Sequence, residues 1–416
     1  MREVVTSRFA TSAWCWLALM FACAVSALAV SPVPTKSSAA RFAVAVEPRT
    51  EEELAFVTAL SLDTWSEHAD AKQPIVVVMA GDSIDALAAR GIPHDIVVDD
   101  IDDVAAHERQ RLARRSRLAT SSEWFSDYRD LVELNAYLER LVDRHSGLAT
   151  KRRLGASVEG RSIEAIEIGR GGEHKIVLNG GQHAREWVSV MVPMCIADRM
   201  LAAHDRDLRV RRILDTVTFV IVPVVNPDGY VHTWTVDRYW RKNRRGGYGV
   251  DLNRNYDFGW GGAGSSPDRS SPNYRGEHPS SEPETQAMRS LFERERIAAH
   301  IDFHSYSQVI VYPWSFQRAE PADSAAFEAI ASRMSAALQA RHGQPYAIRP
   351  GSKLKVGAGG TLGDWAYGAT GALSFLLELR PANGPGGFVL PPEQIVPTCE
   401  ESLAAVLELA DAISRQ

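Results

Sequence analysis

Several features are scarce in this 416-residue sequence, and each scarcity excludes a class of protein. Four cysteines are too few for a disulfide-stapled scaffold, and the 30 glycines follow no collagen-like period. The 46 basic residues do not outnumber the 52 acidic ones, so the net charge of −6 offers no overall attraction to nucleic acid. With 45% hydrophobic residues, the chain is too apolar to be disordered and long enough for more than one domain.

Long apolar runs are also scarce, and the run at the N-terminus is short. Residues 13–29 follow two arginines and end in Ala27-Leu28-Ala29, a small-x-small cleavage pattern. This run is marginal for crossing a membrane core of about 30 Å. We therefore expect a removable signal peptide at 1–29 rather than an anchor, and a secreted protein, extracellular or periplasmic, that does not associate with a membrane. The remaining cysteines, Cys195 and Cys399, either pair or are two buried small hydrophobes.

Residues 30–106 form an acidic segment with five Lys or Arg against fourteen Asp or Glu. Short apolar runs alternate there with helical spacing, which predicts a small α+β domain. The predicted strands are 42–46, 75–79 and 95–98, and the predicted helices are 50–61 and 83–90. The next segment, 107–121, carries five arginines between Arg109 and Arg117. It is either a processing site for a trypsin-like protease or a solvated linker.

From residue 122 to 416 the pattern changes to buried apolar runs separated by amphipathic helices. Such a pattern is typical of an α/β fold with a mixed, mostly parallel central sheet that helices cover on both faces. The predicted strands are 175–179, 217–225, 297–303, 309–313 and 373–379, and the predicted helices are 124–145, 187–203, 283–296, 322–342 and 398–414. Residues 226–281 are rich in Gly, Asn, Pro and Ser and predict long functional loops.

A His and a Glu three residues apart, His183 and Glu186, follow the strand at 175–179. On a helical turn the two side chains would face the same way and reach one metal ion. This spacing is weak evidence alone, because His204 and Asp207 repeat it in an ordinary helix-end context. A third ligand from a neighbouring strand would strengthen the interpretation.

The strand at 297–303 offers two candidates for the third ligand, His300 and His304. They lie about 13 Å apart along one face of an extended strand, so they cannot bind the same ion. His304 stands at the carboxyl end, where open α/β sheets place their sites. We therefore predict that His304 is the ligand and that His300 is a core histidine with satisfied hydrogen bonds.

Two further regions carry polar side chains in unusual settings. Arg241, Arg244, Asn253 and Arg254 lie in a loop region and suit bidentate capture of a carboxylate, although a solvated basic loop would look the same. Glu378 ends a very apolar strand, where a carboxylate is costly unless it faces a wet or metal-bearing site. Such a buried carboxylate is a candidate general base with a raised pKa.

These regions, in this order and spacing, resemble the zinc metallocarboxypeptidases of the pancreatic carboxypeptidase A/B type. The resemblance covers essentially all of residues 122–416, and it likens the acidic segment to the family's pro-domain and the Arg-rich stretch to its activation linker. The matching motifs are GGQHAREW, NPDGY, VDLNRNYDFGW, IDFHSYSQVIVYP and FLLELR.

The resemblance implies a role for each matching residue. His183, Glu186 and His304 would hold one zinc ion, and Asp251 would orient the first histidine. Glu378 would be the general base and Arg244 would stabilise the oxyanion. The implied substrate-binding residues are Arg185, Asn253, Arg254, Tyr306 and Gly363. The Ser305–Tyr306 bond would be cis.

Two positions depart from the family pattern. The mobile-loop Tyr that lies eight residues before Asp-Trp is replaced by Val356, which implies weaker substrate binding with the chemistry retained. The residue before Asp-Trp is Gly363, which supplies neither charge nor bulk. We expect A-like removal of apolar or aromatic C-terminal residues, although Lys353 and Lys355 could instead favour acidic ones.

The main hypothesis is therefore a monomeric secreted zymogen. It would be activated by a trypsin-like protease and would act on peptides or proteins with a free C-terminal carboxylate. A second hypothesis is a relative that cleaves cell-wall peptides, which the Asn253/Arg254 pair does not exclude. A third is a non-catalytic binding protein on the same fold, although the implied ligands and the base are all present. Dinucleotide-binding and Ser-hydrolase motifs fail, because GAGGTLG is wrongly spaced and no G-x-S-x-G occurs.

Overall fold

The computed structural model describes residues 40–66, 74–114, 123–354, 357–382 and 386–415, which all belong to one compact unit of the chain. The predicted signal peptide lies outside these residues, as do Val356 and Lys355. Within the described ranges, no helix combines the length and the apolar character needed to cross a membrane.

The N-terminal module is an α+β unit with a four-stranded antiparallel sheet in the order β2-β3-β1-β4. Its elements are β1 (Arg41–Val46), α1 (Glu51–Leu60), β2 (Asp63–Thr64), β3 (Ile75–Ala80), α2 (Gly81–Ala89), β4 (His94–Val98) and α3 (Ile101–Arg114). The Thr50 side chain accepts a hydrogen bond from the backbone N–H of Glu53 and so caps α1, as expected of an N-cap threonine.

The larger module is built on an eight-stranded mixed sheet in the order β11-β10-β12-β9-β7-β8-β6-β5. The four central strands, β12, β9, β7 and β8, are mutually parallel, and the antiparallel pairs lie toward the two sides. The strands are β5 (Ala149–Ala156), β6 (Ser162–Ile168), β7 (His174–Asn179), β8 (Val217–Val222), β9 (Ile297–Ser305), β10 (Val309–Tyr312), β11 (Ala347–Pro350) and β12 (Leu373–Leu379). The α/β fold class is confirmed.

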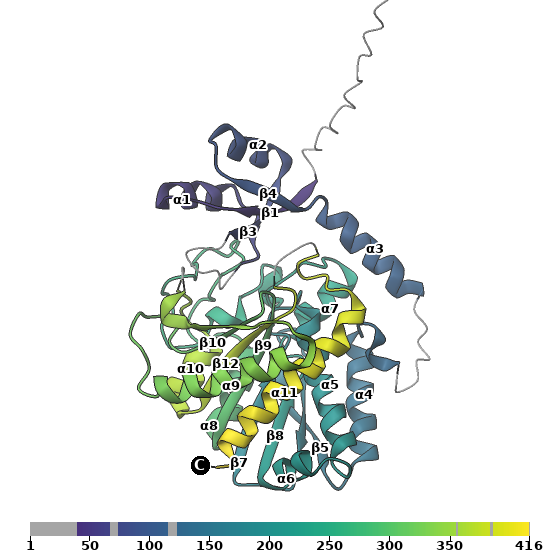
Figure 1. Cartoon of the computed structure of the whole chain (residues 1–416). Coiled ribbons are helices and arrows are strands. Elements are labelled where there is room, and N and C mark those ends of the chain that lie inside the picture. Colours follow the sequence, from purple (N-terminus) through teal and green to yellow (C-terminus); the bar gives the residue numbers. More distant parts are fainter. Residues whose placement is uncertain (1–39, 67–73, 115–122, 355–356, 383–385, 416) are drawn as a thin grey trace, which may run out of the picture. The chain divides into compact units, whose positions relative to one another are not determined.

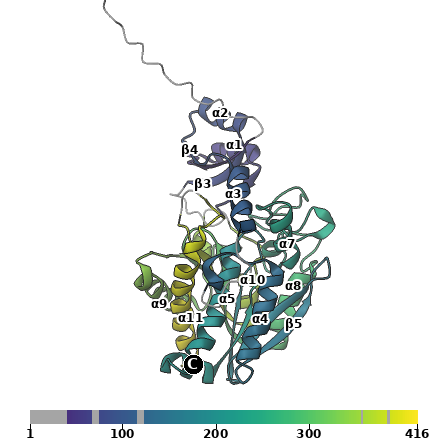
Figure 2. The same ribbon diagram turned by 90° about the vertical axis from the view of Figure 1, so that its right-hand side faces the viewer.

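Helices cover both faces of this sheet and bury a separate apolar cluster on each. Figure 1 shows α9 and α11 lying side by side over one face, where α4, α5 and α6 also contribute to the larger cluster. In the rotated view, α8 lies beside β5 on the other side from α9 and α11 (Figure 2). The helices are α4 (Leu131–Arg144), α5 (Trp187–Ala203), α6 (Leu208–Thr216), α7 (Pro227–Thr235), α8 (Pro283–Arg294), α9 (Ser324–His342), α10 (Leu362–Thr370) and α11 (Ile395–Ile413). Short 3-10 turns are η1 (Trp124–Ser126), η2 (Arg245–Gly247), η3 (Leu252–Arg254), η4 (Gly351–Lys353) and η5 (Pro392–Gln394).

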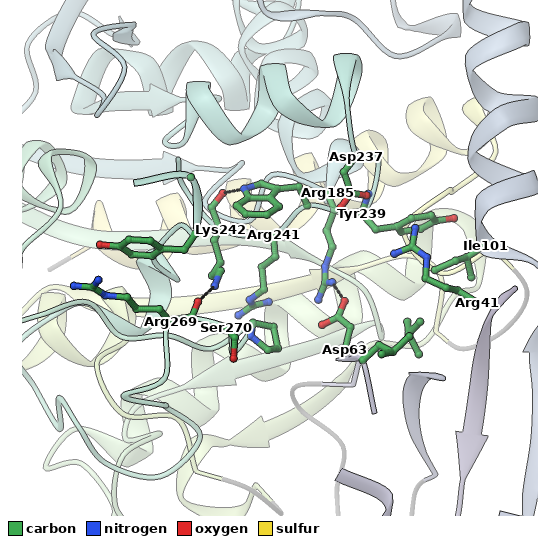
Figure 3. A pocket seen from close by; sticks show the side chains of 16 residues that line it. Arg41, Asp63, Ile101, Arg185, Asp237, Tyr239, Arg241, Lys242, Arg269 and Ser270 are labelled. Carbon is green, nitrogen blue, oxygen red and sulfur yellow. Dashed lines mark hydrogen bonds and ion pairs between the residues drawn. The ribbon is translucent and has the colours of Figure 1, made fainter. Parts of the chain in front are cut away.

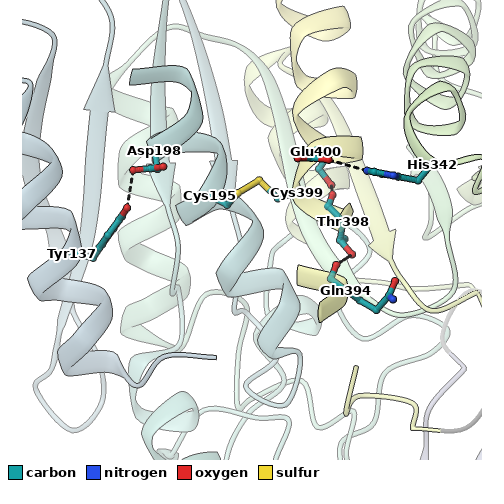
Figure 4. Close-up of a disulfide and its surroundings, with 9 residues drawn as sticks. Tyr137, Cys195, Asp198, His342, Gln394, Thr398, Cys399 and Glu400 are labelled. Atoms are coloured by element: carbon teal, nitrogen blue, oxygen red, sulfur yellow. Dashed lines mark hydrogen bonds and ion pairs between the residues drawn. A yellow bond between two sulfur atoms is a disulfide. The ribbon is translucent and has the colours of Figure 1, made fainter. Parts of the chain in front are cut away.

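The two cysteines of the larger module form a disulfide between α5 and α11 (Figure 4). Cys195 and Cys399 are separated by 204 residues in the chain and both are buried. The bond therefore joins two helices of the same face that already pack against each other. The pairing left open by the sequence is thus resolved in favour of a disulfide.

Several predicted boundaries were wrong, and local capping explains the clearest case. The predicted helix 124–145 begins only at Leu131, because Asp130 and Glu133 form a reciprocal capping box that fixes the start of α4. The strand predicted to reach residue 225 ends at Val222. The turn motif at Asn226 instead caps α7, with Pro227 at its first position.

The first part of the Arg-rich segment is helical. Residues 107–114 belong to helix α3, whose Glu108 is buried and pairs with Arg238 of the larger module. Residues 115–121 lie outside the described part of the chain.

Candidate metal centre

The predicted site residues gather at the carboxyl ends of three adjacent parallel strands, β7, β9 and β12. His183 and Glu186 lie in the segment that follows β7, His304 lies near the end of β9, and Glu378 lies near the end of β12. The carboxyl ends of parallel strands meet at one edge of a sheet, which is where open α/β folds place their sites.

The segment after β7 is shaped by two glycines that allow close approach. A Cβ atom on Gly180 would lie 1.9 Å from the carbonyl oxygen of Ser189, and Gly181 has a φ of +63°. The Ser189 hydroxyl accepts a hydrogen bond from the N–H of Gly181 and so fixes the segment to the first turn of α5. The prediction that His183 and Glu186 share a helical turn was wrong, because α5 begins at Trp187. A tight turn presents both side chains instead.

Three side chains converge as a metal-binding set: His183, Glu186 and His304. His183 Nδ1 lies 2.8 Å from Glu186 Oε1, and His304 Nδ1 lies 3.0 Å from Glu186 Oε2. The two Nδ1 atoms are 3.1 Å apart, close to the roughly 3.4 Å that separates two nitrogen ligands of a tetrahedral zinc ion. All three residues are buried. Among the described residues this is the one cluster of its kind.

A carboxylate lies next to the second nitrogen of each histidine. His183 Nε2 lies 3.2 Å from Asp251 Oδ1, as predicted for the orienting residue. His304 Nε2 lies 3.0 Å from Asp302 Oδ2, at ion-pair distance although its N–H is not aligned for a hydrogen bond. Carboxylates beyond the ligands are typical of zinc sites, where they fix the tautomer that turns the other nitrogen toward the metal.

The electrostatics of the cluster also suit a cation. Burial alone would raise the pKa of Glu186, but the imidazoles of His183 and His304 hold that pKa at about 2. The glutamate is therefore ionised, and two nitrogens and one carboxylate oxygen point at a common centre. Two imidazoles and a carboxylate are the donor set of catalytic zinc sites, in which a fourth position stays open. The residues present fit zinc.

The structure brings Arg241, rather than the predicted Arg244, to this centre. Arg241 donates from Nε and Nη2 to Asp251 Oδ2, at 3.1 and 2.8 Å, and its Nη1 lies 3.2 Å from His183 Nδ1. The Arg244 guanidinium instead lies over the ring of Trp240 and 4.0 Å from Glu159. Both arginines stand out in the sequence, but loop residues three apart carry no periodicity that shows which one points inward.

Glu378 lies beside the ligands, because the register of the parallel strands pairs it with His304. Its side chain is buried. Burial raises the pKa of Glu378 to about 8, and the negative charge of Glu186 adds to that rise. The strand thus places a buried carboxyl group beside the metal set.

The predicted carboxylate-binding pair lies in the short turn η3, which Asp251 caps. Asp251 accepts from the N–H of Asn253 at 3.0 Å, and Asn253 Oδ1 accepts from the N–H of Leu362 at 2.9 Å. Arg254 is held by its Nη1–H, which donates to the Asn253 carbonyl at 2.7 Å. The pair is therefore tied to the same loop that orients His183.

Two other predicted substrate-binding residues contact the N-terminal module. Arg185 forms an ion pair with Asp63 and donates to the carbonyl of Thr64 at 3.3 Å. The ring of Tyr306 packs against Trp65, with ring centroids 6.5 Å apart. The Ser305–Tyr306 peptide bond is cis, as predicted.

A cavity of about 360 Å³ opens beside Arg185 and Arg241. Figure 3 shows that its charged lining comes from both modules and is predominantly basic. The basic lining residues are Arg41, Arg185, Arg241, Lys242 and Arg269, and the acidic ones are Asp63 and Asp237.

A second, much smaller cavity, of about 20 Å³, lies at Gly363. It is lined by apolar and hydroxyl side chains together with Asp364, whose carboxylate accepts from the N–H groups of Ser315 and Phe316. Lys353 is not among its lining residues; its side chain is 69% exposed and lies 3.8 Å from Glu320. The described lining therefore contains no basic side chain.

The prediction for His300 is confirmed. Its side chain is fully buried, with Nδ1 2.7 Å from Ser374 Oγ and Nε2 2.5 Å from Asn179 Oδ1. Burial lowers the pKa of His300 to about 4, so the ring is neutral at pH 7. Asp302, between the two histidines, was missed by the sequence reasoning. The signal was present, because residues 300, 302 and 304 alternate onto one face of a strand.

Comparison with known protein families agrees with this geometry. The family model described as zinc carboxypeptidase matches residues 134–405. Carboxypeptidase A2 of Mus musculus is 33% identical over 355 residues, which cover 82% of this chain and 85% of that protein. Carboxypeptidase B of Bos taurus is 34% identical over 300 residues, covering 70% of this chain and 72% of that protein.

Solved structures show the same similarity in three dimensions. The carboxypeptidase A from Helicoverpa armigera superposes with a TM-score of 0.82 at 26% identity, covering 91% of this chain and 99% of that one. Thrombin activatable fibrinolysis inhibitor superposes with a TM-score of 0.81 at 28% identity, covering 91% of this chain and 100% of that one.

Proposed function

This chain belongs to the zinc carboxypeptidase family and is a zinc metallocarboxypeptidase with a His183/Glu186/His304 site; on that premise, we propose that it is a secreted zymogen that removes the C-terminal residue of peptides. The proposal rests above all on the strand register that sets Glu378 beside His304. The metal set and a buried proton acceptor thereby share one edge of the sheet.

Glu378 is proposed as the general base. Bound zinc supplies a Lewis acid that lowers the pKa of a water molecule to about 7. Glu378 accepts the proton of the attacking water and later gives it to the leaving amine. Its burial beside the ligands supports this role, because general bases work best when their pKa lies near the working pH.

Arg241 is proposed as the group that stabilises the developing oxyanion, in place of the predicted Arg244. Its guanidinium is buried and is held beside His183 by two hydrogen bonds to Asp251. A donor fixed in this way needs little reorganisation when charge develops on the substrate, which is the basis of oxyanion stabilisation.

Asn253 and Arg254 are proposed to bind the substrate's C-terminal carboxylate, with Arg185 and Tyr306 lining the neighbouring surface. An amide next to a planar guanidinium suits a carboxylate, and recognition of that group restricts cleavage to the chain end. We propose that the C-terminal side chain lies against Gly363. The cavity there is about 20 Å³, room for about one water molecule, so its walls must move apart to admit that side chain. Because the lining has no basic group, it supports a preference for apolar or aromatic residues over acidic ones.

The N-terminal module is proposed to be a pro-domain that shields the site until the Arg-rich segment is cut. Asp63 pairs with Arg185, and Trp65 packs against Tyr306, so two proposed substrate-binding residues contact this module. The disulfide between Cys195 and Cys399 supports secretion, since such bonds persist in oxidising compartments.

The test is hydrolysis of blocked dipeptides by purified proenzyme before and after trypsin treatment. We expect release of C-terminal apolar or aromatic residues only after cleavage near Arg114–Arg117. A variant with Arg114, Arg115 and Arg117 all changed to Gln should resist activation. Full activity of the uncut chain would contradict the zymogen assignment. Fastest release of C-terminal Lys or Arg would contradict the specificity.

A further inference from the structure

A stripe of buried polar residues crosses three neighbouring strands beneath the metal centre. On β9, His300, Asp302 and His304 alternate with apolar residues and so share one face. The parallel register pairs Asp302 with Asn179 of β7 and His300 with Ser374 of β12. All five residues are buried, and such a stripe is costly in a sheet core unless its polar groups satisfy one another.

The stripe forms a continuous chain of contacts. Ser374 Oγ lies 2.7 Å from His300 Nδ1, and His300 Nε2 lies 2.5 Å from Asn179 Oδ1. Asn179 Nδ2 donates to Asp302 Oδ1 at 2.6 Å. Asp302 Oδ2 accepts from Gln182 Nε2 at 2.6 Å and lies 3.0 Å from His304 Nε2.

Along this series of contacts, the donor and the acceptor of each hydrogen bond can be assigned in only one way. Asn179 donates its amide N–H to Asp302, so its amide oxygen faces His300. His300 must then carry its proton on Nε2 and accept from the Ser374 hydroxyl on Nδ1. The low pKa of His300 supports this arrangement, because a neutral ring has one donor and one acceptor.

Ser374, the member of this series of contacts farthest from His304, reaches the cavity at Gly363. Ser374 is one of the residues that line this cavity, and a Cβ atom on Gly363 would lie 3.4 Å from Ser374 Oγ. The next lining residue on the same strand face is Leu376, which is apolar and has no side-chain hydrogen-bonding group. Ser374 and Leu376 therefore both line the cavity, but only Ser374 can take part in the series of hydrogen bonds.

We propose that Asp302 is a positioning residue for the zinc ligand His304, and that Asn179, His300 and Ser374 hold Asp302 in place and link the ligand to the cavity at Gly363. This inference rests on the zinc site but not on any assignment of substrate or base. Carboxylates placed behind metal-bound histidines orient the ring and raise its affinity for the ion, so the link acts through geometry.

The experiment measures the zinc dissociation constant of the full chain by competition with a chelator. Asp302→Asn keeps the shape of the side chain but removes its negative charge and replaces one acceptor oxygen by an N–H donor, and we expect zinc affinity to fall about 10- to 100-fold. Ser374→Ala should weaken zinc binding about threefold, as expected for the loss of one neutral hydrogen bond. Leu376→Val is the matched control and should bind zinc as the wild type does.

The absorption spectrum of the Co²⁺-substituted protein gives a second readout that a merely structural role would not move. We expect a changed ligand-field spectrum for Asp302→Asn and an unchanged one for Leu376→Val. Wild-type zinc affinity and spectrum in Asp302→Asn would overturn the positioning role. Equal effects of Ser374→Ala and Leu376→Val would overturn the link to the cavity. Thermal unfolding of the metal-free proteins identifies any variant that fails to fold. In that case His300→Gln tests the same series of hydrogen bonds.

Discussion

The two histidines of the zinc site are held from opposite sides by different kinds of structure. His183 is fixed by a loop, through Asp251 and Arg241, and this network is made of charged groups. His304 is fixed by the central sheet, through Asp302 and the largely neutral chain behind it.

The two sides therefore differ in what else they contribute to the site. The loop side also carries Asn253 and Arg254, so one segment holds the metal ligand and presents the groups proposed to bind substrate. On the sheet side, Asp302 and the residues behind it only position His304, whereas Glu378 of the same sheet is the proposed base. Changes on the loop side should therefore affect both metal binding and turnover, whereas a change at Asp302 should affect metal binding alone.

The largest effect is expected where the two sides meet, at Glu378. Glu378→Gln removes the proposed base while keeping its shape, and we expect kcat to fall about 10²- to 10⁴-fold. Zinc content should stay at the wild-type level, because Glu378 is not a ligand. Steady-state hydrolysis of a blocked dipeptide and metal analysis of the same sample measure the two quantities. Retained turnover would show that another group takes the proton.

The next effect separates two arginines of the loop side. Arg241→Ala removes a buried donor beside His183, and we expect kcat to fall about 10²- to 10³-fold, as for loss of an oxyanion-binding donor. Arg244→Ala is the matched control and should leave kcat close to that of the wild type. The reverse ranking in kinetic assays would restore the original prediction for Arg244.

The two sides should also respond to pH in opposite directions. On the loop side, Asn243 donates to Glu284 and Glu282, and burial raises the pKa of Glu284 to about 7, with the negative charge of Glu282 adding to the rise. The folded state then holds a proton that the unfolded chain releases near pH 4.5. Stability from this group is full below pH 4.5 and is lost as the pH rises through 7, by about 3 kcal/mol.

On the sheet side the sign is opposite. The pKa of His300 is lowered to about 4, so the unfolded chain takes up a proton near pH 6.5 while the folded protein does not. Stability from His300 is full above pH 6.5 and is lost as the pH falls through 4, again by about 3 kcal/mol. Denaturant unfolding at several pH values measures both. Glu284→Gln should remove the loss of stability that occurs as the pH rises through 7, and His300→Gln should remove the loss that occurs as the pH falls through 4. Parallel pH profiles of stability for the wild type and both variants would contradict the assignment.

The smallest effect compares the two orienting carboxylates directly. Asp251→Asn and Asp302→Asn should each weaken zinc binding about 10- to 100-fold. At saturating zinc, kcat should fall only for Asp251→Asn, because Asp251 also holds Arg241. Equal loss of kcat in both variants would remove the distinction between the two sides.

The same division explains what the sequence could predict. His304 could be chosen over His300 because it lies at the carboxyl end of its strand, and the structure confirms this choice. Glu378 could be singled out because its strand is so apolar, and the structure confirms that its side chain is buried beside the ligands. Loop residues follow no period, so Arg244 was predicted where Arg241 lies in the site. Asp302 was not predicted, although it shares one strand face with His300 and His304.

Boundaries set by local contacts were also beyond the sequence argument. The tight turn that carries His183 and Glu186 depends on the approach of Gly180 to Ser189 of α5, a contact between two elements that no local pattern specifies. The extension of α3 to Arg114 depends on pairing between Glu108 and Arg238, which are 130 residues apart.

Zinc binding by His304→Ala tests most directly whether distant segments close around a single ion. Metal analysis of the purified full chain, after dialysis against a weak chelator, should find one zinc per wild-type chain and almost none in the variant. Stoichiometric zinc in His304→Ala, held as tightly as in the wild type, would show that the ion does not depend on this strand and would contradict the site described above.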